Sequence, residues 1–215
     1  MNRKFHPWEG GEGKVTGQYL HSHIQLAKKC IKEERFNDAI EHLKATSDYP
    51  HNLGEGKLSG ALENDIHYWM GNTYEAMGNI EFANQFWRKA SEGDSVPEAA
   101  MYYNDQSPDK IFYQGMALNK LNREEEARER FGNLLEYGLE NMRVPFKMDY
   151  FAVSLPDLLI FEEDLQKRHE LFCIYLIGLG HLGLGHFIEA KEAFNTVLAD
   201  DNYHSGALIH LKLIP

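Results

Sequence analysis

The chain has 215 residues and a formal net charge of −11 at pH 7, which argues against a surface that binds nucleic-acid phosphates. Hydrophobic residues make up 43% of it, as in ordinary globular proteins. No apolar run approaches the roughly 20 residues of a membrane-spanning helix. The first residues carry no signal-peptide pattern, but this says little about location because the chain can be a piece of a longer one. The compartment is left open, with a cytoplasmic location slightly favoured.

Residues 1–16 are predicted to form an irregular N-terminal arm, because glycine and proline are dense there. Trp8 is the exception in this arm, since a large aromatic side chain usually docks onto something. Residues 17–215 are predicted to form one helical domain. Its two cysteines, Cys30 and Cys173, lie on apolar helical patterns, which favours buried thiols over a disulfide.

The first predicted helix pair lies near residues 20–50. Thr16 is placed to cap its first helix, and apolar residues then recur at helical spacing. The second helix carries Ala39, Ile40 and Leu43. A long loop, residues 49–60, follows this pair.

The pattern is clearest in residues 64–97, where two short helices flank Met77-Gly78-Asn79. Small residues recur at the eighth, twentieth and twenty-seventh positions of this unit, and large ones at the eleventh and twenty-fourth. These positions are occupied by Gly71, Ala83, Ala90, Tyr74 and Trp87. Small residues let the two helices approach closely, and the large ones fill the adjoining space. One such unit cannot bury its apolar face alone, so it needs neighbours.

A third pair is predicted near residues 108–138. Ser107, Pro108 and Asp109 give a cap residue, a proline in the first turn and an acid near the positive helix end. Ala39, Ala83 and Ala127 stand 44 residues apart, so a long loop recurs between pairs. Gly138 is predicted to end the second helix.

Residues 139–156 interrupt the rhythm and are predicted to be an irregular or short-helical insert. A long helix is expected from Pro156, and the fourth pair lies near residues 171–202. Asp201 or Asn202 is predicted to cap a last helix over residues 203–211. That helix would cover the exposed end of the stack.

These four units resemble tetratricopeptide repeats (TPRs), which are helix–turn–helix units of about 34 residues. The resemblance implies an all-α, TPR-like right-handed superhelix of about four helix pairs. Long inter-repeat loops and a C-terminal capping helix complete this expectation.

Four strings outside the repeat positions carry a narrower resemblance: HPWEGGEGKV, YPHNLGEGKL, MYYNDQSPD and DYFAVSLPDLLIFEEDL. They resemble the C-terminal helical region of large bacterial proteins with an N-terminal β-rich, partly mutarotase-like domain of unknown function. The resemblance implies that the chain is the C-terminal piece of a longer protein whose other part binds or acts on carbohydrate. It assigns no catalytic residue here.

The titratable residues do not form a recognisable catalytic or metal motif. His21 and His23 stand two residues apart, and His181 and His186 five apart, so neither pair places two imidazoles on one helix face as HExxH does. Residues 124–126 are three consecutive glutamates whose side chains diverge on a helix, as expected of a solvated face. We therefore expect no metal, no cofactor and no enzymatic activity.

The tetrapeptide Gly-Glu-Gly-Lys occurs at residues 11–14 and 54–57. Glycines beside a lysine before a helix could form an anion-binding nest, although the spacing is not that of a phosphate-binding P-loop. Tight loop geometry with the lysine in solvent is the alternative.

The first helix of each pair is expected to line a concave groove. The residues predicted to bind there are Tyr68, Asn72, Glu75, Phe112, Met116, Asn119 and Lys120. Predicted loop contacts are Trp8, Lys14, Glu55, Lys57 and Tyr103.

We expect a non-catalytic scaffold that binds a protein segment or a neighbouring domain of the same polypeptide. The alternative is the helical part of a carbohydrate-binding or carbohydrate-active protein. A rigid spacer or dimerisation element is a third reading.

Overall fold

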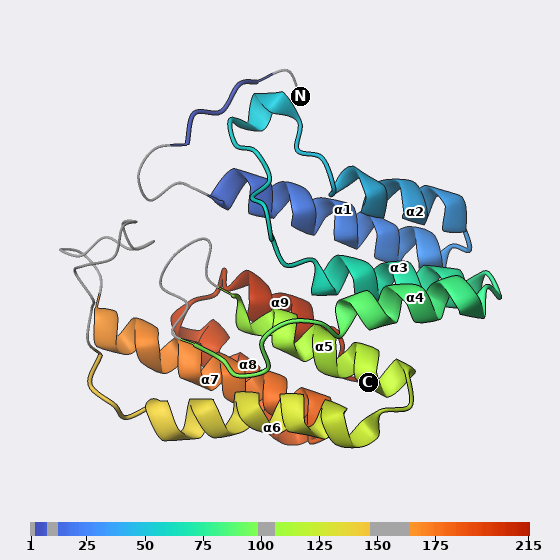
Figure 1. Ribbon diagram of the computed structural model, residues 1–215. Coiled ribbons are helices and arrows are strands. Elements are labelled where there is room, and N and C mark those ends of the chain that lie inside the picture. Colours follow the sequence, from blue (N-terminus) through green and yellow to red (C-terminus); the bar gives the residue numbers. More distant parts are fainter. Residues whose placement is uncertain (1–2, 8–12, 99–105, 147–163) are drawn as a thin grey trace.

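The computed structural model describes residues 3–7, 13–98, 106–146 and 164–215, and within them every regular element is a helix (Figure 1). The all-α prediction is therefore confirmed for the described part of the chain. The α-helices are α1 (Lys14–Lys32), α2 (Phe36–Ala45), α3 (Asn64–Ala76), α4 (Ile80–Ala90), α5 (Pro108–Lys120), α6 (Glu124–Asn141), α7 (Leu165–Leu184), α8 (Phe187–Asp200) and α9 (Ser205–Leu211). A short 3-10 helix, η1, spans His51–Leu53.

The first eight α-helices form four hairpins, each made of two consecutive helices in contact (Figure 1). The first helices of the hairpins pack in order, α1 on α3, α3 on α5 and α5 on α7. The second helix of each hairpin contacts the first helix of the next, so the hairpins stack along the chain. We call the side of α1, α3, α5 and α7 that turns away from α2, α4, α6 and α8 the inner face.

In each hairpin, a small residue of the first helix packs directly against a large side chain of the second. A methyl group added at Gly71 would lie 2.4 Å from the Trp87 ring, and one at Gly115 would lie 2.4 Å from the Phe131 ring. Gly178 faces Phe194 in the same way. In the first hairpin the smaller pair Ala27 and Leu43, both buried, occupies these positions. The predicted matching of small and large residues is confirmed.

Each hairpin also turns at the same point of the repeat, through one residue in the left-handed backbone region. The N–H of the next residue then donates to the carbonyl oxygen five residues earlier, which satisfies a free carbonyl at the helix end. The left-handed residues are Glu34 (φ 58°), Gly78 (φ 78°), Asn122 (φ 59°) and Gly185 (φ 80°). The donors and acceptors are Arg35 and Cys30, Asn79 and Tyr74, Arg123 and Leu118, and His186 and His181, at 2.8 to 2.9 Å.

Gly138 does not end α6, which continues to Asn141. Gly138 is buried, and a methyl group there would lie 2.7 Å from the Cys173 carbonyl oxygen of α7. The glycine is needed because α6 and α7 approach closely at this point, so its role is packing between hairpins.

Two predicted helix starts also differ from the structure. The first helix begins at Lys14 rather than at residue 17, after Gly13 with φ 76°, and Thr16 lies inside it. The last helix begins at Ser205 and is capped by His204, not by Asp201 or Asn202. The predicted start at Pro156 lies outside the described residues, as does most of the 139–156 insert. The structure describes α7 from Leu165, and the Asp164 side chain accepts from the Lys167 N–H. The predicted start after Ser107 is confirmed.

Gly115→Ala tests the close approach inside a hairpin. We expect a loss of about 1 to 3 kcal/mol in the free energy of unfolding, because the added methyl overlaps the Phe131 ring. Gly132→Ala is the matched control in α6, where an added methyl meets nothing within 4 Å. It should gain about 0.5 to 1 kcal/mol from helix propensity. Denaturant unfolding measures both changes, and equal stabilities would contradict this packing.

Candidate functional site

The inner face is partly covered by the chain's own last helix. α9 packs on α7 and α8, as expected of a helix at the end of the stack. It also reaches α5, where the His210 ring meets the Phe112 ring edge-on at 5.1 Å between centroids. On α7, the Tyr175 hydroxyl oxygen lies 3.1 Å from His210 Nδ1. The predicted role of this helix as an end cap is therefore too narrow, because it also packs against Phe112 of α5.

Two residues predicted to line an open groove are core residues instead. Phe112 is 1% exposed, because it lies between the His210 ring of α9 and the Phe131 ring of α6. Tyr68 is 6% exposed and lies against the rings of Trp69 and Tyr113. Their aromatic character reflects burial, and neither offers an accessible surface to a ligand.

The other predicted groove residues lie closer to solvent, and three of them bind one another or the body of the domain. Glu75 and Lys120 form an ion pair at 2.5 Å that joins α3 to α5, with each side chain about one third exposed. Asn72 accepts a hydrogen bond from the Trp87 indole nitrogen at 3.1 Å. Met116 is half-buried, and Asn119 is exposed.

A second ion pair joins α3 and α5 deeper in the protein. Lys110 Nζ lies 2.5 Å from Asp65 Oδ1, and the two side chains are 17% and 13% exposed. Burial disfavours the charged ammonium, but Asp65 and Asp109 outweigh this effect, so the pKa of Lys110 is raised. Lys110 is therefore a structural cation at neutral pH, which argues against a role as a catalytic base.

The predicted loop contacts are also used internally where the structure describes them. Glu55 Oε1 accepts from the Gly13 N–H at 2.7 Å, and Glu55 Oε2 accepts from the Thr16 hydroxyl at 3.0 Å. The two Gly-Glu-Gly-Lys segments therefore meet, and the Glu55 carboxylate occupies the anion position at the start of α1. Lys57 pairs with Glu63 at 2.6 Å, and Lys14 is the first residue of α1. Trp8 and Tyr103 lie outside the described residues.

Histidines meet in pairs that the sequence spacing did not indicate. His23 of α1 lies beside His42 of α2, and His181 beside His186 across the α7–α8 turn, each with 3.2 Å between Nδ1 atoms. The residues of the second pair do not share one helix face, since His181 lies in α7 and His186 precedes α8, and the turn between the two helices brings their rings together. Among the described residues, no group of three potential metal ligands occurs.

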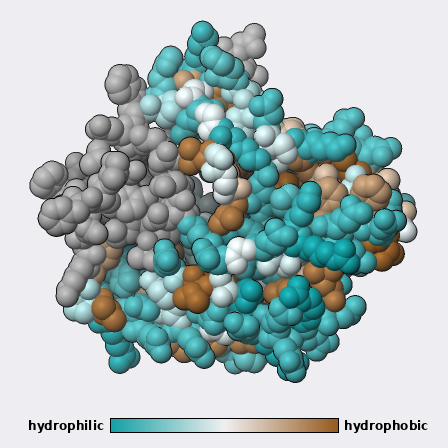
Figure 2. Space-filling view, in the orientation of Figure 1, coloured by the Kyte–Doolittle hydropathy of each residue, from teal (hydrophilic) through white to brown (hydrophobic). Residues whose placement is uncertain are grey.

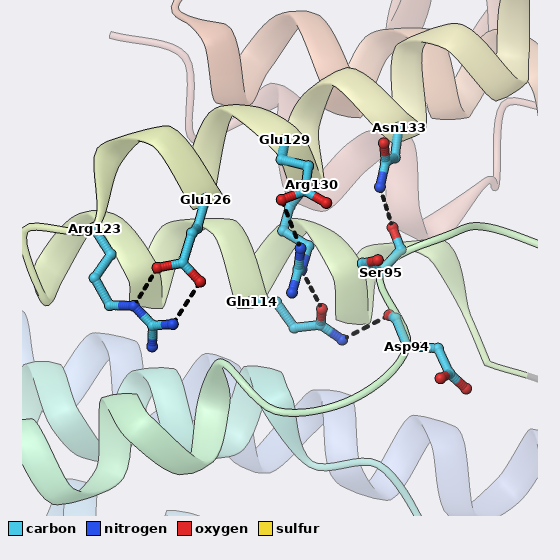
Figure 3. Close-up of polar contacts among 8 residues, drawn as sticks. All are labelled: Asp94, Ser95, Gln114, Arg123, Glu126, Glu129, Arg130 and Asn133. Atoms are coloured by element: carbon cyan, nitrogen blue, oxygen red, sulfur yellow. Dashed lines mark hydrogen bonds and ion pairs between the residues drawn. The ribbon is translucent and has the colours of Figure 1, made fainter.

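A polar cluster between α5 and α6 is structural, because its members are satisfied by neighbours (Figure 3). Buried Gln114 donates to the Asp94 carbonyl oxygen at 3.1 Å and accepts from Arg130 Nε at 3.1 Å. Asn133 donates to the Ser95 carbonyl oxygen at 2.9 Å. These bonds fasten the segment after α4 onto the next hairpin.

Hydrophilic side chains cover most of the face shown in Figure 2, with hydrophobic ones in small groups. Exposed apolar residues include Phe187 and Ile188 at the start of α8. They line a pocket of about 510 Å³ that also touches the C-terminal residues Ile214 and Pro215. No helix in the described parts of the chain is long and apolar enough to cross a membrane.

Sequence reasoning missed the residues that fasten α9, above all His210. A histidine on the apolar side of the predicted last helix was the available signal, but its partners lie on α5 and α7, 35 residues or more away.

No family model matches this chain, and no solved structure matches it either. The chain's own packing and surface are therefore what indicate its function.

Asp65→Asn should lower the free energy of unfolding by about 3 kcal/mol, because it leaves the buried Lys110 ammonium without its partner. Adding Lys110→Met should restore most of the loss, since the unpaired charge is then removed as well. Glu124→Gln, in an exposed pair with Arg128 at 3.7 Å, is the control and should change stability by less than about 0.5 kcal/mol. Equal effects at the two acids in chemical denaturation would rule out a buried pair.

Proposed function

We propose that this chain is a TPR-like scaffold within a larger bacterial protein. In this proposal it forms a right-handed superhelix, has no catalytic role, and binds a protein segment or a neighbouring domain of the same polypeptide through its inner face.

One observation carries the proposal: the packing of each hairpin repeats at one register. A small residue, a buried alanine twelve positions later and a large side chain sixteen positions later recur in all four hairpins. In the second hairpin these are Gly71, Ala83 and Trp87, and in the third Gly115, Ala127 and Phe131. Stacked units of this kind create extended surfaces for binding other chains rather than an enclosed reaction centre.

The inner face supports the proposal through what already rests on it. α9 and the residues after it bury apolar side chains there, with Ala207 and His210 fully buried. A surface that holds one short helix of the chain has the shape and apolar character to hold a segment of similar size from elsewhere.

Within this proposal, the accessible contact residues are those not used by the core. Asn119 is exposed, Met116 is half-buried, and the side chains of the Glu75–Lys120 ion pair are each about one third exposed. These residues would contact a bound segment, whereas Tyr68 and Phe112 would support the surface from below.

Calorimetric titration of this chain with the separately expressed upstream part of its parent protein tests the proposal. We expect a Kd in the micromolar range or tighter, about −8 kcal/mol. Asn119→Arg together with Met116→Glu should weaken binding tenfold or more by placing charge on the inner face. Arg128→Glu, on α6 with a side chain 72% exposed, is the control and should stay within about twofold.

Binding that survives the inner-face variant but fails with Arg128→Glu would place the interface on the outer helices. Absence of binding would reject the interdomain role. A panel of oligosaccharides would then test the alternative, a carbohydrate-binding or carbohydrate-active protein, which rests on the sequence resemblance alone.

A further inference from the structure

Two histidines hold α9 in place, and each must be uncharged to do so. His204 caps the helix, with its ring Nδ1 accepting from the Ala207 N–H at 3.0 Å. Only an unprotonated ring nitrogen can accept. A proton on Nδ1 therefore removes the cap and places a positive charge at the positive end of the helix.

His210 is buried on the other side of the same helix, 2% exposed. Its Nδ1 lies 2.8 Å from the Gly206 carbonyl oxygen, which can only accept, so Nδ1 carries the proton of the neutral ring. Nε2 is buried and has no hydrogen-bond partner among the described residues. A second proton would therefore create a buried cation whose new N–H has no acceptor there.

Aromatic rings surround His210. They belong to Phe112 and Tyr113 on α5, Tyr175 on α7 and Phe194 on α8, with centroids 5.1 to 6.3 Å from the imidazole. Burial raises the pKa of both tyrosines, so these neighbours stay neutral as the pH falls.

The charged groups that face His210 are Asp109 on α5, Asp65 on α3 and Lys28 on α1. Burial lowers the pKa of His210 and outweighs the opposing effects of Asp109, the Gly206 hydrogen bond and Asp65, while Lys28 adds to the lowering. Burial likewise lowers the pKa of His204, against the opposing effect of Asp201.

Acid weakens the docking of α9, because docking lowers the pKa of both His204 and His210. When α9 leaves the inner face, both imidazoles return to water and to an ordinary pKa of about 6.5. Docking is then at full strength above about pH 6.5, and it weakens as the pH falls below that value toward the lower docked values.

We propose that α9 is an acid-sensitive latch, docked over α5 and α7 at neutral pH and released when His204 and His210 take up protons. Release uncovers the aromatic surface of Phe112, Tyr113 and Tyr175 while the four hairpins stay folded. The latch is a property of this chain itself and does not depend on the scaffold role proposed above.

Hydroxyl-radical footprinting read by mass spectrometry at pH 7.5 and pH 5.5 tests the latch. At pH 5.5 each histidine should raise the released population by up to about tenfold. Oxidation of Phe112, Tyr113 and Tyr175 should rise severalfold, normalised to Tyr203, which is already 84% exposed with α9 docked. Phe131, 1% exposed between α5 and α6, should stay protected. An unchanged rate at Phe112 and Tyr175, or a parallel rise at Phe131, would overturn the proposal; the second result would indicate general unfolding.

Variants assign the effect to the two histidines. His204→Asn keeps a side chain that can cap without titrating, and His210→Phe keeps a ring in the apolar pocket. The double variant should lose the pH response. His204→Asn alone keeps His210 in place and should lower the released population at pH 5.5 by up to about tenfold. His181→Asn together with His186→Asn is the control and should respond as the unmodified chain does. A full response in His204→Asn and in the double variant would overturn the assignment.

Discussion

The structure depends on the contact between a small residue and a large side chain within each hairpin. At Gly71 and Gly115 there is no room for even a methyl group, because the rings of Trp87 and Phe131 lie directly against the backbone. The same Phe131 ring fills the space beside Gly183 of α7, so one side chain fixes both a hairpin and its neighbour. Loss of this fit would separate helices that have no other way to bury their apolar faces.

Polar contacts then set how consecutive hairpins align. The two ion pairs between α3 and α5, Asp65–Lys110 and Glu75–Lys120, each join residues 45 apart, about one repeat with its loop. Glu55 performs a similar task at the start of α1, and Gln114 fastens the segment after α4. Several residues whose chemistry indicated a ligand are thus committed to the protein itself, because a stack of small units needs directional contacts between them.

The last helix, α9, buries aromatic side chains that would otherwise be exposed on the inner face. Without α9, the rings of Phe112, Tyr113 and Tyr175 would form an apolar surface beside charged groups. With α9 in place they are core residues, and this part of the inner face is covered. Any partner that uses the covered part must compete with a helix tethered to the same chain, whose effective concentration is high.

The sequence by itself determined the helical class, the four hairpins and the positions of their small and large residues. These follow from local periodicity and from steric matching between residues sixteen apart, as for Gly115 and Phe131. Only the tertiary structure decided three contacts: Gly138 lies within α6 and packs against α7, Glu55 accepts a hydrogen bond at the start of α1, and His210 of α9 packs on Phe112. Such contacts join residues from different hairpins and loops, and their chemistry is the same whether the partner is a ligand or another part of the chain. The burial that distinguishes these two cases exists only once the whole stack has formed.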